Sequence, residues 1–196
     1  FPPMGFRNDA NEIVGYDIDL AAEACKRLNL ELVCQPIDWA AKEQELATGS
    51  IDCIWNGFTI TPERLEAMSF SKPYLDNAQV AIVRADSGFE TLADLAGKKI
   101  GVQAGTTGEW WVTDNVEGAT VVSFKSGIDA AMDLMNGAID AVVLDELPAK
   151  EIVAKNKKLD IVKDKFAKEE YAIAVKKGNS ELVAAINSTI EKMKSN

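Results

Sequence analysis

The sequence predicts an α/β protein with mostly parallel sheets that are covered by helices on both sides. Apolar strand-like runs alternate with helix-like segments along the 196 residues, and this order favours parallel sheets. There is also an internal similarity: Leu46–Ile54 resembles Leu134–Val142, and each segment is a helix end, a glycine, an acidic residue and a buried strand. Together these observations predict two lobes built on the same plan.

The composition excludes several functions. The net charge of −10 disfavours nucleic acid as a partner, because phosphate binding needs a basic surface. The chain has no histidine, so it lacks the usual general base and the commonest metal ligand. No apolar run approaches the roughly 20 residues that span a bilayer. We therefore expect no catalytic residue, no metal and no cofactor.

The expected helices begin at polar residues that can cap them. Asp17 is the expected cap of a helix whose apolar face is Leu20, Ala21, Ala24, Cys25 and Leu28. Thr61 caps a short helix that opens with Pro62, and Ser126 and Ser180 cap two later helices. The other expected helices are Trp39–Ala47, Leu92–Leu95, one after Thr107, and Glu146–Ala154.

The expected strands lie between these helices. They are Glu31–Ile37, Ile51–Trp55, Val80–Val83, Lys99–Gln103, Thr120–Ser123, Ile139–Leu144, Leu159–Val162 and Ala172–Val175.

The three cysteines, Cys25, Cys34 and Cys53, show no CxxC spacing, which disfavours zinc binding and thioredoxin-like chemistry. Two interpretations stay open. Cys25 and Cys34 could form a disulfide, or all three could be buried thiols that pack as small hydrophobic side chains.

The segment Asn56–Arg64 is the most informative about binding. Gly57 lets the backbone approach a ligand, and Thr59 offers a hydroxyl. Arg64 lies in the first turn of its helix, where a cation gains nothing from the helix dipole. Its planar guanidinium suits a carboxylate. The alternative is a surface arginine paired with Glu63 or Glu66.

Two further sites in the sequence could bind the charged groups of a small ligand. The glycine-rich turn Gly101–Gly108 follows a strand and opens a helix, so its backbone N–H groups can bind an anion. It lacks both the Walker A and the full GxGxxG pattern, which disfavours a nucleotide. Asp145 ends a buried strand, where its carboxylate could hold an ammonium group or simply cap the next helix.

Phe1 and Trp39 are candidate aromatic walls, although Trp39 could belong to the core. Of the adjacent Trp110 and Trp111, only one can face inward on a single helix, and the sequence does not decide which.

Several of these motifs resemble the solute-binding proteins of bacterial ABC transporters for polar amino acids. They run in family order along almost the whole chain: Phe1–Phe6, Gly15–Ala21, Ile51-Asp52, Gly57–Arg64, Phe70–Tyr74, Asp94–Lys98, Gly105–Thr107 and Asp145. The Thr-x-Thr-x-Glu-Arg and Phe-Ser-x-Pro-Tyr blocks are together quite specific.

The resemblance implies a role for each site residue. Arg64 would hold the ligand carboxylate, helped by Thr107. The Gly57 carbonyl, the Thr59 hydroxyl and the Asp145 carboxylate would hold the ammonium group. Phe1 and Trp39 would be the aromatic walls, and Asn56 and Gln103 would touch the ligand side chain.

The resemblance also implies the type II periplasmic-binding-protein fold, with two lobes, a two-segment hinge and a ligand in the cleft between the lobes. Residues 1–74 and 173–196 would form lobe 1, residues 79–167 lobe 2, and residues 75–78 and 168–172 the hinge. The family has a strand ahead of the position of Phe1 and a helix with a Lys-Trp-Phe-like tail beyond that of Asn196. We expect both to lie outside this sequence.

The implied protein is an extracytoplasmic monomer, periplasmic or lipid-anchored, that is not an enzyme. Its partners would be a free L-amino acid, with arginine or lysine favoured and glutamine next, and the membrane subunits of an ABC permease. Two alternatives remain. One is an enzyme on the same scaffold, such as a cyclohexadienyl dehydratase, which needs a positioned general acid. The other is a ligand-sensing domain, which needs fused membrane segments.

Overall fold

The chain divides into two compact units, which we describe separately. The computed structural model describes residues 1–195. Unit 1 contains Asn77–Glu169 together with Phe1, and unit 2 contains Pro2–Asp76 and the chain from Glu170 onward. Beyond the terminal residue Phe1, the chain passes between the units twice, once within strand β5 (Leu75–Arg84) and once within strand β10 (Phe166–Tyr171).

Unit 1 is built on one sheet with the strand order β10-β5-β8-β6-β7, and β9 also pairs with β5. The other strands are β6 (Lys99–Gln103), β7 (Thr120–Phe124), β8 (Ala141–Asp145) and β9 (Leu159–Ile161). Strand β6 runs parallel to β7 and β8, whereas β5 runs antiparallel to β8 and β9. The sheet is mixed, and the expectation of a mostly parallel sheet holds only for the β7-β6-β8 part.

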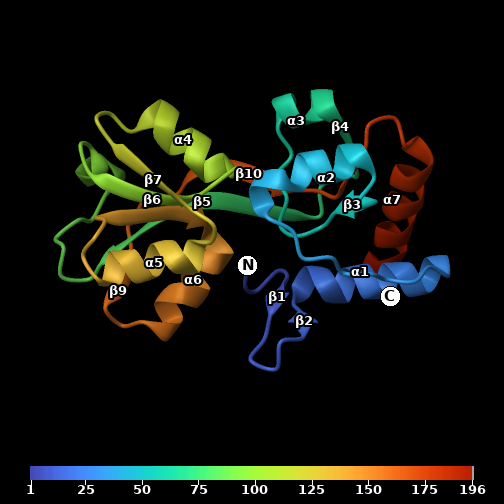
Figure 1. Ribbon diagram of the computed structural model, residues 1–196, viewed down its shortest axis with the longest axis horizontal. Coiled ribbons are helices and arrows are strands. Elements are labelled where there is room, and N and C mark those ends of the chain that lie inside the picture. The colour runs from blue at the N-terminus through green and yellow to red at the C-terminus, as the bar shows by residue number, and fades with distance from the viewer. Residues whose placement is uncertain (196) are drawn as a thin grey trace. The chain divides into compact units, whose positions relative to one another are not determined.

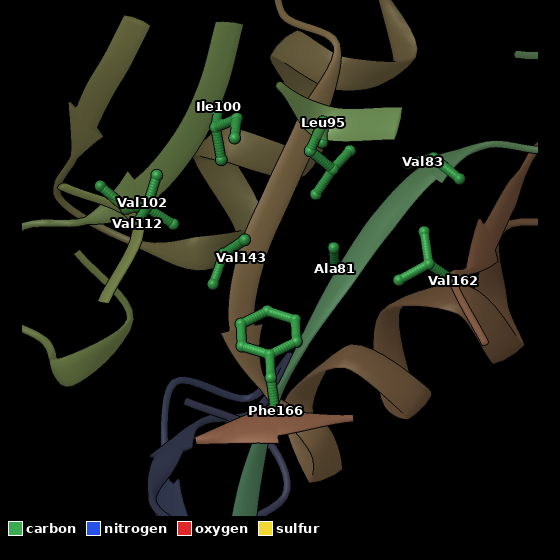
Figure 2. Close-up of a cluster of buried hydrophobic side chains, with 10 residues drawn as sticks. Ala81, Val83, Leu95, Ile100, Val102, Val112, Val143, Val162 and Phe166 are labelled. Atoms are coloured by element: carbon green, nitrogen blue, oxygen red, sulfur yellow. The ribbon is translucent and has the colours of Figure 1, made fainter. Parts of the chain in front are cut away.

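Helices cover both faces of this sheet (Figure 1). They are the 3₁₀ helix η2 (Leu92–Leu95), α4 (Thr107–Asn115), α5 (Gly127–Met135) and α6 (Glu146–Lys155). On one face Leu95 and Val112 pack with Val102, Val143 and Phe166, as Figure 2 shows. On the other face, α5 and α6 pack against β5 and β8 through a second cluster that includes Leu134 and Ala149.

Unit 2 contains two small antiparallel sheets. Strands β1 (Phe6–Arg7) and β2 (Ile13–Val14) pair with each other. The second sheet has the order β3-β11-β4, with β3 (Cys53–Ile54), β4 (Met68–Phe70) and β11 (Ala174–Lys176). Strand β11 belongs to the C-terminal part of unit 2, which follows β10, and it runs antiparallel to both of its neighbours. The prediction of mostly parallel strands is therefore wrong for the part of unit 2 that the structure describes.

The helices of unit 2 pack around this sheet. They are α1 (Tyr16–Leu28), the 3₁₀ helix η1 (Trp39–Ala41), α2 (Lys42–Thr48), α3 (Pro62–Ala67) and α7 (Ser180–Lys194). Phe58 and Ile173 are fully buried and mark its two apolar clusters. Strand β11 is the central strand of this sheet, and its residues Ala174 and Val175 are fully buried.

Several expected caps and elements are confirmed. Thr61 and Ser126 cap α3 and α5 through their hydroxyl groups. The helix at Leu92–Leu95 and the strand at Lys99–Gln103 have the predicted bounds.

Three expectations are wrong. The segment Glu31–Ile37 forms no strand, and Val33 is 75% exposed. A strand needs a neighbour to receive its backbone hydrogen bonds, and this segment pairs with no described strand. Helix α1 is preceded by Gly15 rather than capped by Asp17, and Asn179 rather than Ser180 caps α7.

The open questions about cysteine and tryptophan are also answered. Cys25, Cys34 and Cys53 are free, half-buried thiols, so the disulfide interpretation is not supported. Trp110 is 39% exposed, whereas Trp111 packs on Phe166 with ring centroids 4.1 Å apart. No helix within residues 1–195 is long and apolar enough to cross a membrane.

Candidate functional site

The segment that follows β3 carries the candidate binding groups of unit 2. Gly57 has a φ of 53°, a backbone region that favours glycine. Its N–H donates to the Asp17 Oδ2 at 2.7 Å. Two residues later, Thr59 is buried and forms an isolated bridge with Tyr171. The segment is thus anchored on both sides, which fixes the path of its backbone.

Arg64 is placed by the short helix α3. The Thr61 hydroxyl accepts from the Arg64 N–H at 3.2 Å. The Arg64 side chain is only 3% exposed. Its Nη1 donates to the Thr59 carbonyl at 2.8 Å, and its Nε lies 3.6 Å from a Glu43 carboxylate oxygen. The alternative of a surface arginine paired with Glu63 or Glu66 is therefore wrong.

Aromatic rings support this guanidinium. Its Cζ lies 4.2 Å from the Phe58 ring centroid, a cation–π arrangement. Phe58 also stacks on Phe70 and meets the edge of Trp39, with centroids 5.6 and 5.7 Å away. The buried Lys42 Nζ lies 5.1 Å from the Trp39 centroid. Trp39 therefore packs on the core, as the alternative interpretation expects, and remains half-buried rather than fully covered.

The carboxylate of Asp17 is a functional candidate that the sequence did not reveal as such. It is fully buried, and its Oδ2 accepts from Gly57 N–H and, at 2.9 Å, from the Tyr74 hydroxyl. Burial raises the pKa of this carboxyl above its usual range, and the hydrogen bonds from Gly57 and Tyr74 oppose the shift only in part. The sequence shows an aspartate in the first turn of α1, but the hydrogen-bond partners of Asp17 are 40 and 57 residues away in sequence.

In unit 1, the side chains of Asp145 and Thr107 both contact the buried side-chain amide of Gln79. Gln79 is fully buried in β5, and its Nε2 donates to Asp145 Oδ1 at 2.5 Å. The same nitrogen lies 3.1 Å from Glu169 Oε2 and 3.4 Å from the Thr107 hydroxyl. Asn77 Nδ2 also donates to Glu169 Oε2, at 2.9 Å. The sequence analysis missed both Gln79 and Glu169. A glutamine beside the apolar run Val80–Val83 could have indicated a buried polar side chain.

The glycine-rich turn is partly occupied by the chain itself. Gly105 N–H donates to Glu109 Oε2 at 2.8 Å, and the other oxygen of Glu109 accepts from Ser123 at 2.5 Å. The Thr106 hydroxyl accepts from Glu109 N–H and donates to the Gln103 carbonyl. A carboxylate of the protein thus binds the Gly105 N–H group of the turn, while Thr107 begins α4 beyond it.

The side-chain amides of the remaining candidates donate to backbone carbonyls. Asn56 Nδ2 donates to the Gly5 carbonyl at 3.1 Å, and Gln103 Nε2 donates to the Lys125 carbonyl at 3.0 Å. Asp145 stands at the N-cap position of α6 without a side-chain capping hydrogen bond, so its role as a helix cap is not supported. Phe1 is half-buried.

The structure therefore distributes the candidates between the two units. Unit 2 holds Trp39, Asn56, Gly57, Thr59 and Arg64, and unit 1 holds Phe1, Gln103, Thr107 and Asp145. Within residues 1–195, no group of three or more cysteine, aspartate or glutamate side chains could hold a metal ion. The candidate set combines arginine, carboxylate, hydroxyl and aromatic groups, a chemistry suited to a small charged molecule.

Known proteins agree with this chemistry. Residues 1–196 match the description of the bacterial extracellular solute-binding proteins of family 3. The L-cystine-binding protein TcyJ of Escherichia coli is 33% identical over 98% of this chain and 74% of its own length. The ABC transporter arginine-binding protein 1 of the same species is 34% identical over 99% of this chain and 82% of its own length.

Solved structures give a closer match. A mutant of arginine-bound ArgBP from T. maritima has a TM-score of 0.95 and 42% sequence identity, and the match covers 98% of this chain and 91% of that one. All three relatives are binding proteins by name, which agrees with the expectation of a binding protein rather than an enzyme.

Proposed function

Because the chain belongs to the bacterial extracellular solute-binding proteins of family 3, we propose that it binds a free polar or basic L-amino acid and delivers it to an ABC importer. The observation that carries this proposal is the placement of Arg64, an almost fully buried guanidinium fixed beside the segment Gly57–Thr59. A buried arginine held by packing and hydrogen bonds is pre-organised, and its fork geometry matches a carboxylate.

In the proposed complex, Arg64 binds the α-carboxylate of the ligand, and the N–H and hydroxyl of Thr107 assist it. Thr107 is the first residue of α4, where backbone N–H groups favour an anion. The Gly57 carbonyl, the Thr59 hydroxyl and the Asp145 carboxylate bind the ammonium group. Residues of both units would therefore contribute to one ligand.

Aromatic and amide side chains would select the side chain of the ligand. Phe1 and Trp39 would be aromatic walls, which attract alkyl and cationic groups alike. Asn56 and Gln103 would supply polar contacts. A long cationic or polar side chain suits this set, and the arginine-binding relatives support L-arginine as the first ligand to test, followed by lysine and glutamine.

The two connections within β5 and β10 are the proposed hinge, at residues 75–78 and 168–172. A ligand that contacts both units binds most tightly to the conformation in which both units supply their contacts. Binding would therefore shift the population of the protein toward that conformation. The protein would act as a monomer outside the cytoplasm, in the periplasm or anchored by lipid at the outer face of the membrane. The membrane subunits of the permease would recognise its liganded form.

The test is calorimetric titration of the protein with the twenty amino acids, followed by variants at Arg64. We expect binding of arginine, lysine or glutamine, and a loss of affinity in Arg64→Ala that corresponds to roughly 2–5 kcal/mol. Arg84→Ala is the matched control, because Arg84 is a partly buried arginine that donates to the carbonyls of Leu134 and Ile139, within unit 1. Unchanged affinity in Arg64→Ala would contradict the carboxylate assignment.

A further inference from the structure

We propose that Gln79 is a positioning residue for the ammonium site, and that it aligns the Asp145 carboxylate while leaving the charge of that group intact. This inference rests on the proposed function, because it takes Asp145 as the group that binds the ligand ammonium. No residue pattern in the sequence assigned a role to Gln79. The structure places it in contact with two carboxylates and one candidate ligand hydroxyl.

The position of Gln79 is set by the sheet. In the antiparallel ladder of β5 and β8, Gln79 stands directly opposite Asp145. Opposed residues of such a ladder have Cβ atoms about 4.5–5.5 Å apart, so an amide side chain can reach the carboxylate across the pair. The 2.5 Å contact from Nε2 to Asp145 Oδ1 is therefore built into the strand register.

The chemistry of the amide explains why this residue suits the role. A buried carboxylate needs hydrogen-bond donors, and arginine or lysine would supply them together with a positive charge. Such a cation would neutralise Asp145 and compete with the ligand ammonium. The neutral Gln79 amide donates to Asp145 and Glu169 without cancelling either charge. The amide therefore orients both carboxylates without adding a positive charge beside them.

The surroundings hold the amide in this orientation. Gln79 Oε1 is buried and makes no hydrogen bond within residues 1–195, which costs free energy. The opposite orientation would place this oxygen against two carboxylate oxygens. On its other side, a Cβ added to Gly108 in α4 would lie 2.7 Å from Gln79 Oε1. A glycine at the start of α4 therefore leaves the space that the amide occupies.

The network also reaches both connections between the units. Glu169 is the last residue of unit 1 on the returning strand β10, and Asn77 is the first residue of unit 1 on β5. Glu169 Oε2 accepts from both Asn77 and Gln79. The position of Asp145 is thus tied through Gln79 to the two strands that leave the unit.

The experiment compares Gln79→Leu and Gln79→Glu with the unaltered protein by titration with L-arginine. Gln79→Leu keeps much of the volume but removes the donor, and we expect an affinity about 10- to 100-fold lower, the range of one lost hydrogen bond to a charged group. Gln79→Glu places a third carboxyl group against Asp145 and Glu169, the titratable groups that Gln79 contacts. Its affinity should be lowest at pH 8 and should recover toward pH 5.5, where a bound proton restores one donor.

Val80→Ala is the control for damage to the strand. Val80 is as deeply buried as Gln79 but belongs to the apolar cluster with α5 and α6. This variant should lower the melting temperature and leave both the affinity and its pH dependence unchanged. A merely structural role of Gln79 would make Gln79→Leu behave like Val80→Ala, and that result would overturn the proposal.

Two further outcomes separate this proposal from the proposed function. If the unaltered protein binds no amino acid, the proposed function fails. If it binds arginine and Arg64→Ala abolishes binding, but Gln79→Glu binds equally well at pH 5.5 and pH 8 with unaltered affinity, only the role of Gln79 fails. Should Gln79→Leu not fold, Gly108→Ala displaces the amide from the other side and should weaken binding, whereas equal affinity in that variant would count against the proposal.

Discussion

Asp17 makes the stability of this protein depend on pH in a direction opposite to that of a salt-bridged carboxylate. Burial raises the pKa of its carboxyl above the usual 3.8. The folded protein then binds more protons than the unfolded chain, so the free energy of unfolding falls as the pH rises above this value. Asp17→Asn removes that dependence. We expect the stability of the unaltered protein relative to Asp17→Asn to decrease between pH 4 and pH 7 in denaturant titrations.

Asp19 supplies the control for this measurement. It lies in the same first turn of α1 but is exposed to solvent. Asp19→Asn should alter the helix-dipole contribution by only about 0.3–1 kcal/mol. Parallel pH curves for the unaltered protein and Asp17→Asn would contradict a buried ionisable group at position 17.

The three free thiols should differ in reactivity. Burial raises the pKa of the Cys53 thiol from the ordinary 9.0 to about 11. Since the thiolate is the nucleophile, its fraction at pH 8 should be about a hundredfold lower than that of a fully exposed cysteine. We expect iodoacetamide to modify Cys53 last, as followed by mass spectrometry of the digested protein. Equal rates at Cys53 and Cys25 would show that Cys53 is not protected.

At the level of the elements, the short helix α3 depends on its cap. Six residues are too few for a helix to be stable alone, so the Thr61 hydroxyl contributes directly to the position of Arg64. Thr61→Ala should cost about 1 kcal/mol of stability and also weaken amino-acid binding.

The matched cap is Ser126, whose hydroxyl accepts from Asp129 N–H at the start of α5. Ser126→Ala should cost a similar amount of stability, measured by thermal unfolding, while calorimetry shows unaltered affinity. If both variants lose affinity equally, the effect of Thr61→Ala is a general loss of stability and not a displacement of Arg64.

For the whole molecule, a ligand that contacts both units should stabilise both. At a ligand concentration of about 100 times the dissociation constant, binding adds about 2.7 kcal/mol, or roughly 5–10 °C in melting temperature for a chain of this size. Hydrogen–deuterium exchange with saturating L-arginine should slow in β6 of unit 1 and in β11 of unit 2. Protection confined to one unit would mean that the ligand contacts only that unit.

Local signals in the sequence determined the parts of this protein that depend on neighbouring residues. The caps at Thr61 and Ser126, the strand Lys99–Gln103 and the helix Leu92–Leu95 follow from side chains within a few positions of one another. The local pattern likewise placed Arg64 on a short helix and Asp145 at a strand end. In each case the determining interaction is local, so periodicity and capping chemistry suffice.

Only the tertiary structure decided the features that depend on distant partners. Glu31–Ile37 has a strand-like sequence but no neighbouring strand to pair with among the described residues, and β11 runs against β3 and β4 because of the path of the returning chain. The sequence predicts Asp17 as a helix cap, but in the folded protein its carboxylate accepts hydrogen bonds from Gly57 and Tyr74. The proposed role of Gln79 depends on the strand register, which places this residue opposite Asp145. Hydrogen bonds between residues 40 to 90 positions apart leave no local pattern, because the chain meets these partners only when it is folded.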